Sequence, residues 1–228
     1  MSKELARRAA RIGALAEPTR RALYLYVSAQ PDAVGREEAA EGVGVPAHTA
    51  KFHLDRLVDE GLLDVEFRRL TGRTGPGAGR PAKLYRRSAA EVSVSLPERR
   101  YDLAGEVLAG GVARATRTGA PVADAVRDVA TETGRRLAAE HAGGADELDR
   151  TAGVLARNGY EPRLTDGDLC LTNCPFDRLA VQHPELVCGM NLALVSGVVD
   201  GLGADGLTPE LAPRPGFCCV RVSSARRP

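Results

Sequence analysis

The sequence predicts an α+β protein built from two parts. Apolar residues recur at helical spacing through most of the first 60 residues, and two strand-like stretches follow them. Helical spacing returns after residue 100 and changes to a period of two near residue 160. These observations predict an N-terminal part at residues 1–90, a helical linker or dimerisation region at 91–158, and a cysteine-containing α+β part at 159–228.

Charge divides the chain in the same way. Residues 1–100 carry 18 Lys and Arg against 13 Asp and Glu, whereas residues 101–228 carry 13 against 17, so a net charge of +1 hides a basic and an acidic part. This asymmetry is typical of a polyanion-binding part joined to a different module, although uneven solvated surfaces would look the same. No apolar run approaches the roughly 18 residues of a spanning helix, and the N-terminus lacks a secretory apolar core. We expect a cytoplasmic protein with no membrane partner.

The elements of the first part follow in order. One helix is predicted from about Lys3 to Ser28, with a break or restart at Pro18. A short helix around residues 37–41 and the tight turn GVGV come next. Pro46 then begins another helix, where its missing N–H costs nothing. The predicted order is therefore helix, turn, helix.

The helix that begins at Pro46 is amphipathic. Its apolar face carries Ala50, Leu54, Leu57 and Val58. The opposite face should therefore point outward, and Gly61 can stop the helix. The strand-like stretches LLDVEF and AKLYRR follow, and residues 68–87 hold seven basic side chains and no acidic one.

This arrangement is a candidate for binding double-stranded DNA, because the major groove accepts one helix. The base-reading candidates are His48, Thr49, Lys51 and Phe52. His53 and Arg56 are expected to touch phosphate, and Arg73 and Arg80 of the glycine-rich loop suit a narrow minor groove. Phe52 is as compatible with the core as with DNA. The loop could equally be a solvated hairpin, and the absence of G-x-x-x-x-G-K-[ST] argues against a nucleotide P-loop.

The residues that carry a family resemblance are ALAEPTRRALYLYV, VPAHTAKFHLDRLVDEGLL and RRLTGRTGPGAGRPAKLYRR. Over residues 8–88 they resemble the winged helix-turn-helix domain of ArsR-like bacterial transcriptional regulators. The resemblance implies a homodimer that reads an operator with its second helix. The Cys-x-Cys metal site of some such sensors is absent, since no cysteine precedes residue 170, so any sensing is expected in the second part.

The second part begins after a linker or edge strand at residues 88–98. Helices are predicted at 101–118, 122–141 and 147–158, followed by a hairpin with its turn near residue 167. A long apolar helix at about 184–202 and the strand FCCVRVSS complete the chain. No internal repeat is evident.

All five cysteines lie in the last 59 residues. In a cytosolic chain such a cluster indicates metal, iron–sulfur or redox chemistry before disulfides. No Cys-x-x-Cys is present, so we expect folding to bring together Cys174, Cys188 and only one of Cys218 and Cys219, since successive strand residues point to opposite faces. Cys170, inside an alternating strand, is expected to be a buried small hydrophobe. His183 could be a further ligand or a helix cap.

The stretch NCPFDRLAVQHPELVCGMNLAL, with the late strand CCVRV, is similar to the sensor domain of SufR-like repressors. The resemblance implies an iron–sulfur cluster, a [4Fe–4S] centre among the possibilities, held by Cys174, Cys188 and Cys218 or Cys219. Relatives with a further cysteine between the second and last ligands differ from this chain, which has none at 189–217. The fourth ligand is therefore open.

Three alternatives stay open for the second part. Zinc or a thiol switch at Cys218–Cys219 would use the same residues, and a regulator sensing an apolar small molecule would need no metal. An enzyme with a cysteine nucleophile would need a base such as His183 or His141. The sequence supplies no third residue to orient that base, so we expect a regulator rather than an enzyme.

Overall fold

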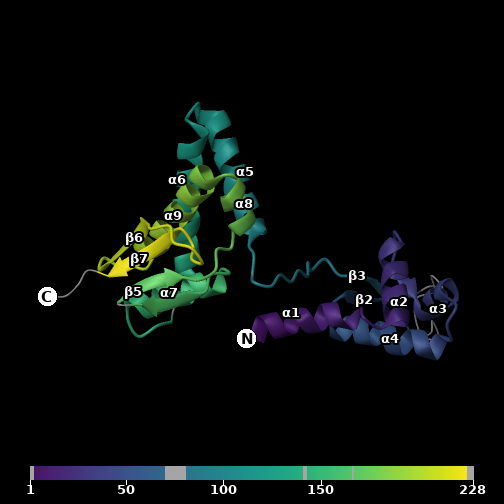
Figure 1. Ribbon diagram of the computed structural model, residues 1–228. Coiled ribbons are helices and arrows are strands. Elements are labelled where there is room, and N and C mark those ends of the chain that lie inside the picture. Colours follow the sequence, from purple (N-terminus) through teal and green to yellow (C-terminus); the bar gives the residue numbers. More distant parts are fainter. Residues whose placement is uncertain (1–2, 70–80, 141–142, 166, 225–228) are drawn as a thin grey trace. The chain divides into compact units, whose positions relative to one another are not determined.

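The computed structural model describes residues 3–69, 81–140, 143–165 and 167–224 (Figure 1). The chain divides into two compact units, Met1–Val94 and Ser95–Pro228. Each contains helices and an antiparallel sheet, so the α+β prediction is confirmed.

The first unit is a helical cluster with a small sheet. Its elements are α1 (Lys3–Ala14), α2 (Pro18–Ala29), β1 (Val34–Gly35), α3 (Arg36–Val43), α4 (Ala47–Asp59), β2 (Leu63–Arg68) and β3 (Ala82–Arg87). The predicted restart at Pro18 is confirmed, because Pro18 opens α2 beneath the cap of Glu17. Gly44 adopts a left-handed conformation (φ 76°) in the turn between α3 and α4. A residue with a Cβ atom would be strained in this conformation.

The three strands of this unit pair in the order β1-β3-β2. β2 and β3 form an antiparallel hairpin in register from Leu63↔Arg87 to Arg68↔Ala82. The helices and sheet share a core whose fully buried members include Leu23, Leu54 and Tyr85. The sequence did not predict β1, which is only two residues long and pairs with β3.

The second unit packs helices against a four-stranded sheet. Its elements are α5 (Tyr101–Thr118), α6 (Val122–Ala139), α7 (Glu147–Arg157), β4 (Pro162–Thr165), β5 (Asp168–Leu171), α8 (Asp177–Gln182), α9 (Pro184–Gly201), β6 (Leu207–Leu211) and β7 (Val220–Ser224). The strands run antiparallel in the order β4-β5-β7-β6. β6 was not predicted, because Pro209 weakens the strand pattern; a proline is tolerated here since β6 lies at the sheet edge.

The apolar helix α9 is the centre of this unit. Its buried residues include Val187, Met190, Leu194 and Val195, and they join one core with β5 and β7. A helix that is apolar on most sides must be covered on most sides, which explains its central position. None of the described helices is both long and apolar enough to cross a membrane.

Candidate DNA interface and cysteine cluster

The outer face of α4 carries most of the side chains predicted to read DNA. Ala50, Leu54 and Leu57 are fully buried, so the predicted amphipathic pattern is confirmed. A groove of about 500 Å³ on the opposite face is lined by Arg20, His48, Lys51, Phe52, Asp55, Arg56 and Asp59. Thr49 is half-buried at the start of the helix. This face therefore offers a row of polar and basic groups around one aromatic ring.

Phe52 lies outside the core. Its side chain is 68% exposed, and its ring meets the ring of His53 edge-on at a centroid distance of 5.1 Å. Of the two environments considered for Phe52, the structure therefore shows the solvent-facing one. An exposed aromatic ring on this face can pack on a thymine methyl group.

His53 points toward α2 rather than outward. Its side chain is 13% exposed, and Nδ1 lies 3.4 Å from Glu17 Oε2. Glu17 also caps α2 by accepting hydrogen bonds from the Thr19 and Arg20 amides. This position differs from the predicted phosphate contact, because His53 lies between the apolar and outer faces of α4 and reaches a carboxylate of the neighbouring helix.

Asp55 gathers three donors and was not singled out by the sequence. Its carboxylate accepts hydrogen bonds from Lys51 Nζ (2.8 Å), Lys83 Nζ (2.6 Å) and the Tyr85 hydroxyl (2.8 Å). Burial would raise the pKa of Asp55, but these three bonds outweigh it and lower the pKa to about 2. Burial, with the bond to Asp55, raises the pKa of Tyr85. Asp55 thus ties α4 to β3 and orients Lys51, the leading base-reading candidate.

The remaining basic candidates for DNA contact are Arg56, Arg73 and Arg80. Arg56 is exposed and pairs with Glu60 one turn along, with Nη2 2.5 Å from Oε1. Arg73 and Arg80 lie outside the described residues. The role predicted for the loop between β2 and β3 therefore stays a prediction.

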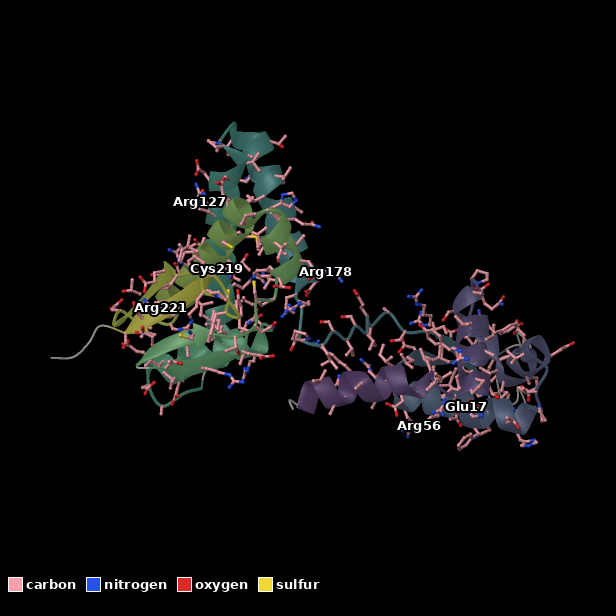
Figure 2. The ribbon with its side chains drawn as sticks, in the orientation of Figure 1. Glu17, Arg56, Arg127, Arg178, Cys219 and Arg221 are labelled. Carbon is pink, nitrogen blue, oxygen red and sulfur yellow. The ribbon has the colours of Figure 1, made fainter. Side chains whose placement is uncertain are left out.

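Four cysteines from separate segments line one cavity in the second unit. Cys174 lies in the turn after β5, Cys188 lies on α9, and Cys218 and Cys219 immediately precede β7. All four line a cavity of about 340 Å³. Figure 2 shows Cys219 in the second unit, near α9 and β7. The predicted convergence of Cys174, Cys188 and the late cysteines is present in the fold.

Both Cys218 and Cys219 face this cavity, so the prediction that only one would do so is wrong. That prediction assumed a pleated strand, in which neighbours alternate between faces. Strand β7 begins only at Val220, and the backbone bends at Cys219. Adjacent residues outside a strand need not alternate.

The four thiols lie close enough to change one another's pKa. Interaction with Cys174, then with Cys219, holds the pKa of Cys218 well below its usual range despite burial. Interaction with Cys218 together with burial raises the pKa of Cys174 and of Cys219, and Cys188 contributes further to the shift at Cys219. Cys218 is therefore the thiol that most readily carries negative charge.

A buried polar relay supports Cys218 from the other side. Asn191 Nδ2 donates to Cys218 Sγ at 3.1 Å, and Asn191 Oδ1 accepts from the Tyr160 hydroxyl at 2.5 Å. Asn191 is 1% exposed and Tyr160 2%. Neither residue was predicted from the sequence. An asparagine within the otherwise apolar stretch LVCGMNLALV was the available signal.

The other two candidates of this region lie elsewhere. Cys170 is buried on β5 and lines a neighbouring cavity of about 290 Å³, where Arg214 Nη2 lies 3.7 Å from its sulfur. His183 is exposed at the junction of α8 and α9, and its carbonyl accepts from the Val187 amide at 2.9 Å. His183 does not line the four-cysteine cavity. Its position is that of a helix cap.

The donor set suits a thiolate-ligated centre in number and chemistry. Four soft sulfur donors are the usual ligands of iron–sulfur clusters and of structural zinc. As the side chains stand, no group of three or more His, Cys, Asp or Glu within the described residues is arranged to hold a metal ion. Binding a centre would therefore require the cysteine side chains to move from this arrangement.

Comparison with known proteins adds one match. Residues 15–66 match the family described as a helix-turn-helix domain. No curated protein and no solved structure matches the chain. The matched segment spans α2, α3, α4 and most of β2, so it contains the groove-lining face of α4. Residues 15–66 are therefore a helix-turn-helix domain of the type found in DNA-binding transcriptional regulators.

Proposed function

We propose that the protein is a dimeric transcriptional repressor whose operator affinity responds to an iron–sulfur cluster held by Cys174, Cys188, Cys218 and Cys219. The observation that carries the proposal is the convergence of these four thiols on one cavity, in the unit that follows a helix-turn-helix domain. Thiols buried as isolated small hydrophobes need not meet in this way.

The surroundings of the thiols support ligation. The low pKa of Cys218 favours its thiolate, which is the form that binds metal. The Asn191 amide donates to the same sulfur, and hydrogen bonds to cluster sulfurs are one of the features that set reduction potential. A [4Fe–4S] cluster bound by these cysteines would make their ligation sensitive to oxidation.

Gain or loss of this ligation would change how three segments of the second unit are held together. Ligation by all four cysteines would join the Cys174 turn, α9 and the start of β7. Loss of ligation would leave these elements held by hydrogen bonds and apolar packing. In a dimer, two copies of α4 must enter major grooves about 34–36 Å apart, so a small displacement weakens both contacts.

Anaerobic purification tests the proposal. We expect visible absorption with bound iron and sulfide, either as isolated or after reconstitution, and a change in DNA affinity when the cluster is removed. A protein that stays colourless and free of iron after reconstitution would refute the cluster.

Serine variants locate the ligands. Cys188→Ser is expected to abolish or strongly reduce iron and sulfide binding, because the thiolate of α9 is lost. Cys170→Ser is the matched control: it changes a cysteine of the same unit that lines the neighbouring cavity, and it should leave metal content unchanged. Equal loss in the two variants would count against the assigned ligand set.

A thiol switch at the same residues is the second candidate, and the gathering of four thiols on one cavity beside a low-pKa Cys218 favours it. Two thiols, Cys218 and a neighbour such as Cys219, would lose two electrons and two protons to hydrogen peroxide: a disulfide bond forms, the O–O bond breaks, and two water molecules result. Metal analysis separates the candidates, since iron, zinc or neither would be found. Regulation that survives serine at Cys174, Cys188 and Cys218 would indicate a small-molecule sensor instead.

Lys51 is expected to read sequence. Replacing Lys51 with alanine should relax the preference at one base pair by roughly tenfold, within the about 1–3 kcal/mol that a good base contact supplies. Sequences selected from a randomised duplex library by the parent and variant would measure this. A uniform loss of affinity, with the same selected sequence, would assign Lys51 to phosphate.

A further inference from the structure

The segment that connects the two units leads to residues that hydrogen-bond to the turn carrying Cys174. Residues 88–98 form neither helix nor strand and lead from β3 toward α5. The residues that follow bond directly to the turn: Arg99 Nη1 donates to the Cys174 carbonyl at 2.9 Å, and the Arg100 amide donates to the Pro175 carbonyl at 3.1 Å. We call residues 98–100 and 173–175 together the clasp.

Asn173 completes the clasp, and both the oxygen and the nitrogen of its side-chain amide are hydrogen-bonded. Its Oδ1 accepts from Arg99 Nη1, while its Nδ2 donates to the carbonyls of Glu98 at 2.9 Å and Gly159 at 2.6 Å. Asn173 is 6% exposed, so breaking these bonds would leave a buried amide unsatisfied. The position of residues 98–100 is thus tied to the conformation of the turn.

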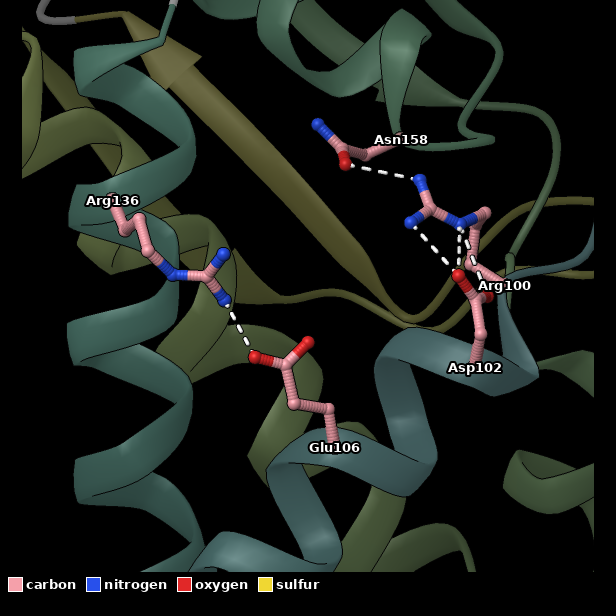
Figure 3. Close-up of polar contacts among 5 residues, drawn as sticks. All are labelled: Arg100, Asp102, Glu106, Arg136 and Asn158. Atoms are coloured by element: carbon pink, nitrogen blue, oxygen red, sulfur yellow. Dashed lines mark hydrogen bonds and ion pairs between the residues drawn. The ribbon is translucent and has the colours of Figure 1, made fainter. Parts of the chain in front are cut away.

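Charged groups link the clasp to the cysteine cavity. The Arg99 side chain is 19% exposed, and its Nη2 lies 3.6 Å from Oδ2 of Asp177, a residue that lines the cavity beside Cys174. Arg100 is held separately, by Asn158 at 3.2 Å and by Asp102 (Figure 3). The two adjacent arginines therefore differ: among the described residues, the side chain of Arg99 hydrogen-bonds to the Cys174 turn, whereas that of Arg100 bonds to Asn158 and Asp102.

We propose that Arg99 is a positioning residue that couples the state of Cys174 to the chain leading into the DNA-binding unit. A change in the Cys174 side chain, by ligation or covalent modification, shifts the carbonyl that Arg99 holds. The shift reaches residues 98–100 through the hydrogen bond of Arg99 to that carbonyl, which adds to the bonds of Asn173 with Glu98 and of Arg100 with Pro175, and then continues along the covalent chain. The inference rests on the proposed function, which makes Cys174 the responsive residue.

Amide hydrogen exchange of the full-length protein tests the coupling. The amides of Arg99 and Arg100 donate to Ser95 Oγ (2.7 Å) and the Pro175 carbonyl (3.1 Å), so a peptide spanning 95–101 reports on the clasp. We expect its exchange rate to change by about fivefold or more between the apo and reconstituted protein, as for typical coupling between sites. In Arg99→Ala this difference should become much smaller, because only the Asn173–Glu98 and Arg100–Pro175 bonds remain, while iron and sulfide content stays at the parent level.

Arg100→Ala is the matched control, because it removes a neighbouring guanidinium that bonds Asn158 and Asp102. It should keep the difference seen in the parent protein. Arg99→Lys, which retains the charge but has a single donor group for the three acceptors on Asn173, Cys174 and Asp177, should restore part of it. A difference that persists undiminished in Arg99→Ala, or that is absent in the loaded parent, overturns the proposal, and loss of iron from Arg99→Ala would show a merely structural role.

Failure of the proposed function is distinguishable. If the parent protein binds no iron, the cluster is refuted, and the same peptide is compared before and after alkylation with N-ethylmaleimide, located on Cys174 by mass spectrometry. A change in exchange that Arg99→Ala abolishes would support the clasp. Unchanged exchange after modification of Cys174 would overturn it.

Discussion

Replacing Gly197 with alanine is expected to destabilise the second unit by about 3 kcal/mol, at the upper end of the cost of overpacking. A Cβ at Gly197 on α9 would lie 2.1 Å from the Thr131 carbonyl oxygen on α6. Gly134 on α6 makes the reciprocal approach, since its Cβ would lie 2.1 Å from the Leu194 carbonyl oxygen. Both obstacles are backbone atoms, so the two helices would have to separate. Urea unfolding followed by circular dichroism measures the loss.

Gly105→Ala is the matched control. Gly105 lies within α5, and a Cβ there would meet no atom within 4 Å. Alanine is the better helix former by about 1 kcal/mol, so this variant should be slightly more stable than the parent. If both substitutions had the same effect, the close approach of α6 and α9 would not limit stability. Because α9 carries Cys188 and Asn191, Gly197→Ala should also disturb the cysteine cavity.

Asp55→Asn is expected to destabilise the first unit at neutral pH by about 1–2 kcal/mol, a figure reduced for the partial exposure of the carboxylate. The folded pKa of about 2 lies below the ordinary value of 3.8. The charged form therefore stabilises the folded state above about pH 4, and this contribution is lost as pH falls through about 2. The difference between parent and variant should shrink across that window.

Urea unfolding midpoints at about pH 7, 4 and 2.5 would follow this change. Asp59→Asn removes the same charge from the exposed face of α4, and we expect it to alter stability by only about 0.5 kcal/mol or less. A cost at Asp55 that does not depend on pH would show that the three hydrogen bonds do not require the ionised carboxylate. Release of Lys51 and Lys83 in Asp55→Asn should also steepen the salt dependence of DNA binding.

Elements with strong local signals could be predicted from the sequence. The apolar spacing of α4 predicted which side is buried, and Pro18 predicted where α2 begins. Elements with weak local signals could not: β1 has two residues, and β6 contains Pro209. Both exist because a neighbouring strand supplies hydrogen bonds, and such pairing joins residues far apart in the sequence.

The candidate site divides in the same way. The positions of the cysteines in the sequence indicated a shared site. The alternation expected of strand residues did not predict the bend at Cys219, which lets both Cys218 and Cys219 face the cavity. The inward position of His53 depends on Glu17 of another helix. The roles of Asn191 and Asn173 follow from their hydrogen bonds to Cys218 and Arg99, which are distant in the sequence and become neighbours only in the fold.

By itself the sequence determined the helix-turn-helix pattern, the apolar face of α4, the charge difference between the two halves and the confinement of every cysteine to the last 59 residues. Only the tertiary structure decided which thiols meet and which carboxylate holds Lys51, and that the chain from the first unit ends on the Cys174 turn. The physical reason is the separation along the sequence over which each interaction acts. Periodicity and capping act between residues a few positions apart, whereas Cys174 and Cys218 become neighbours only when apolar burial packs α9 against the sheet.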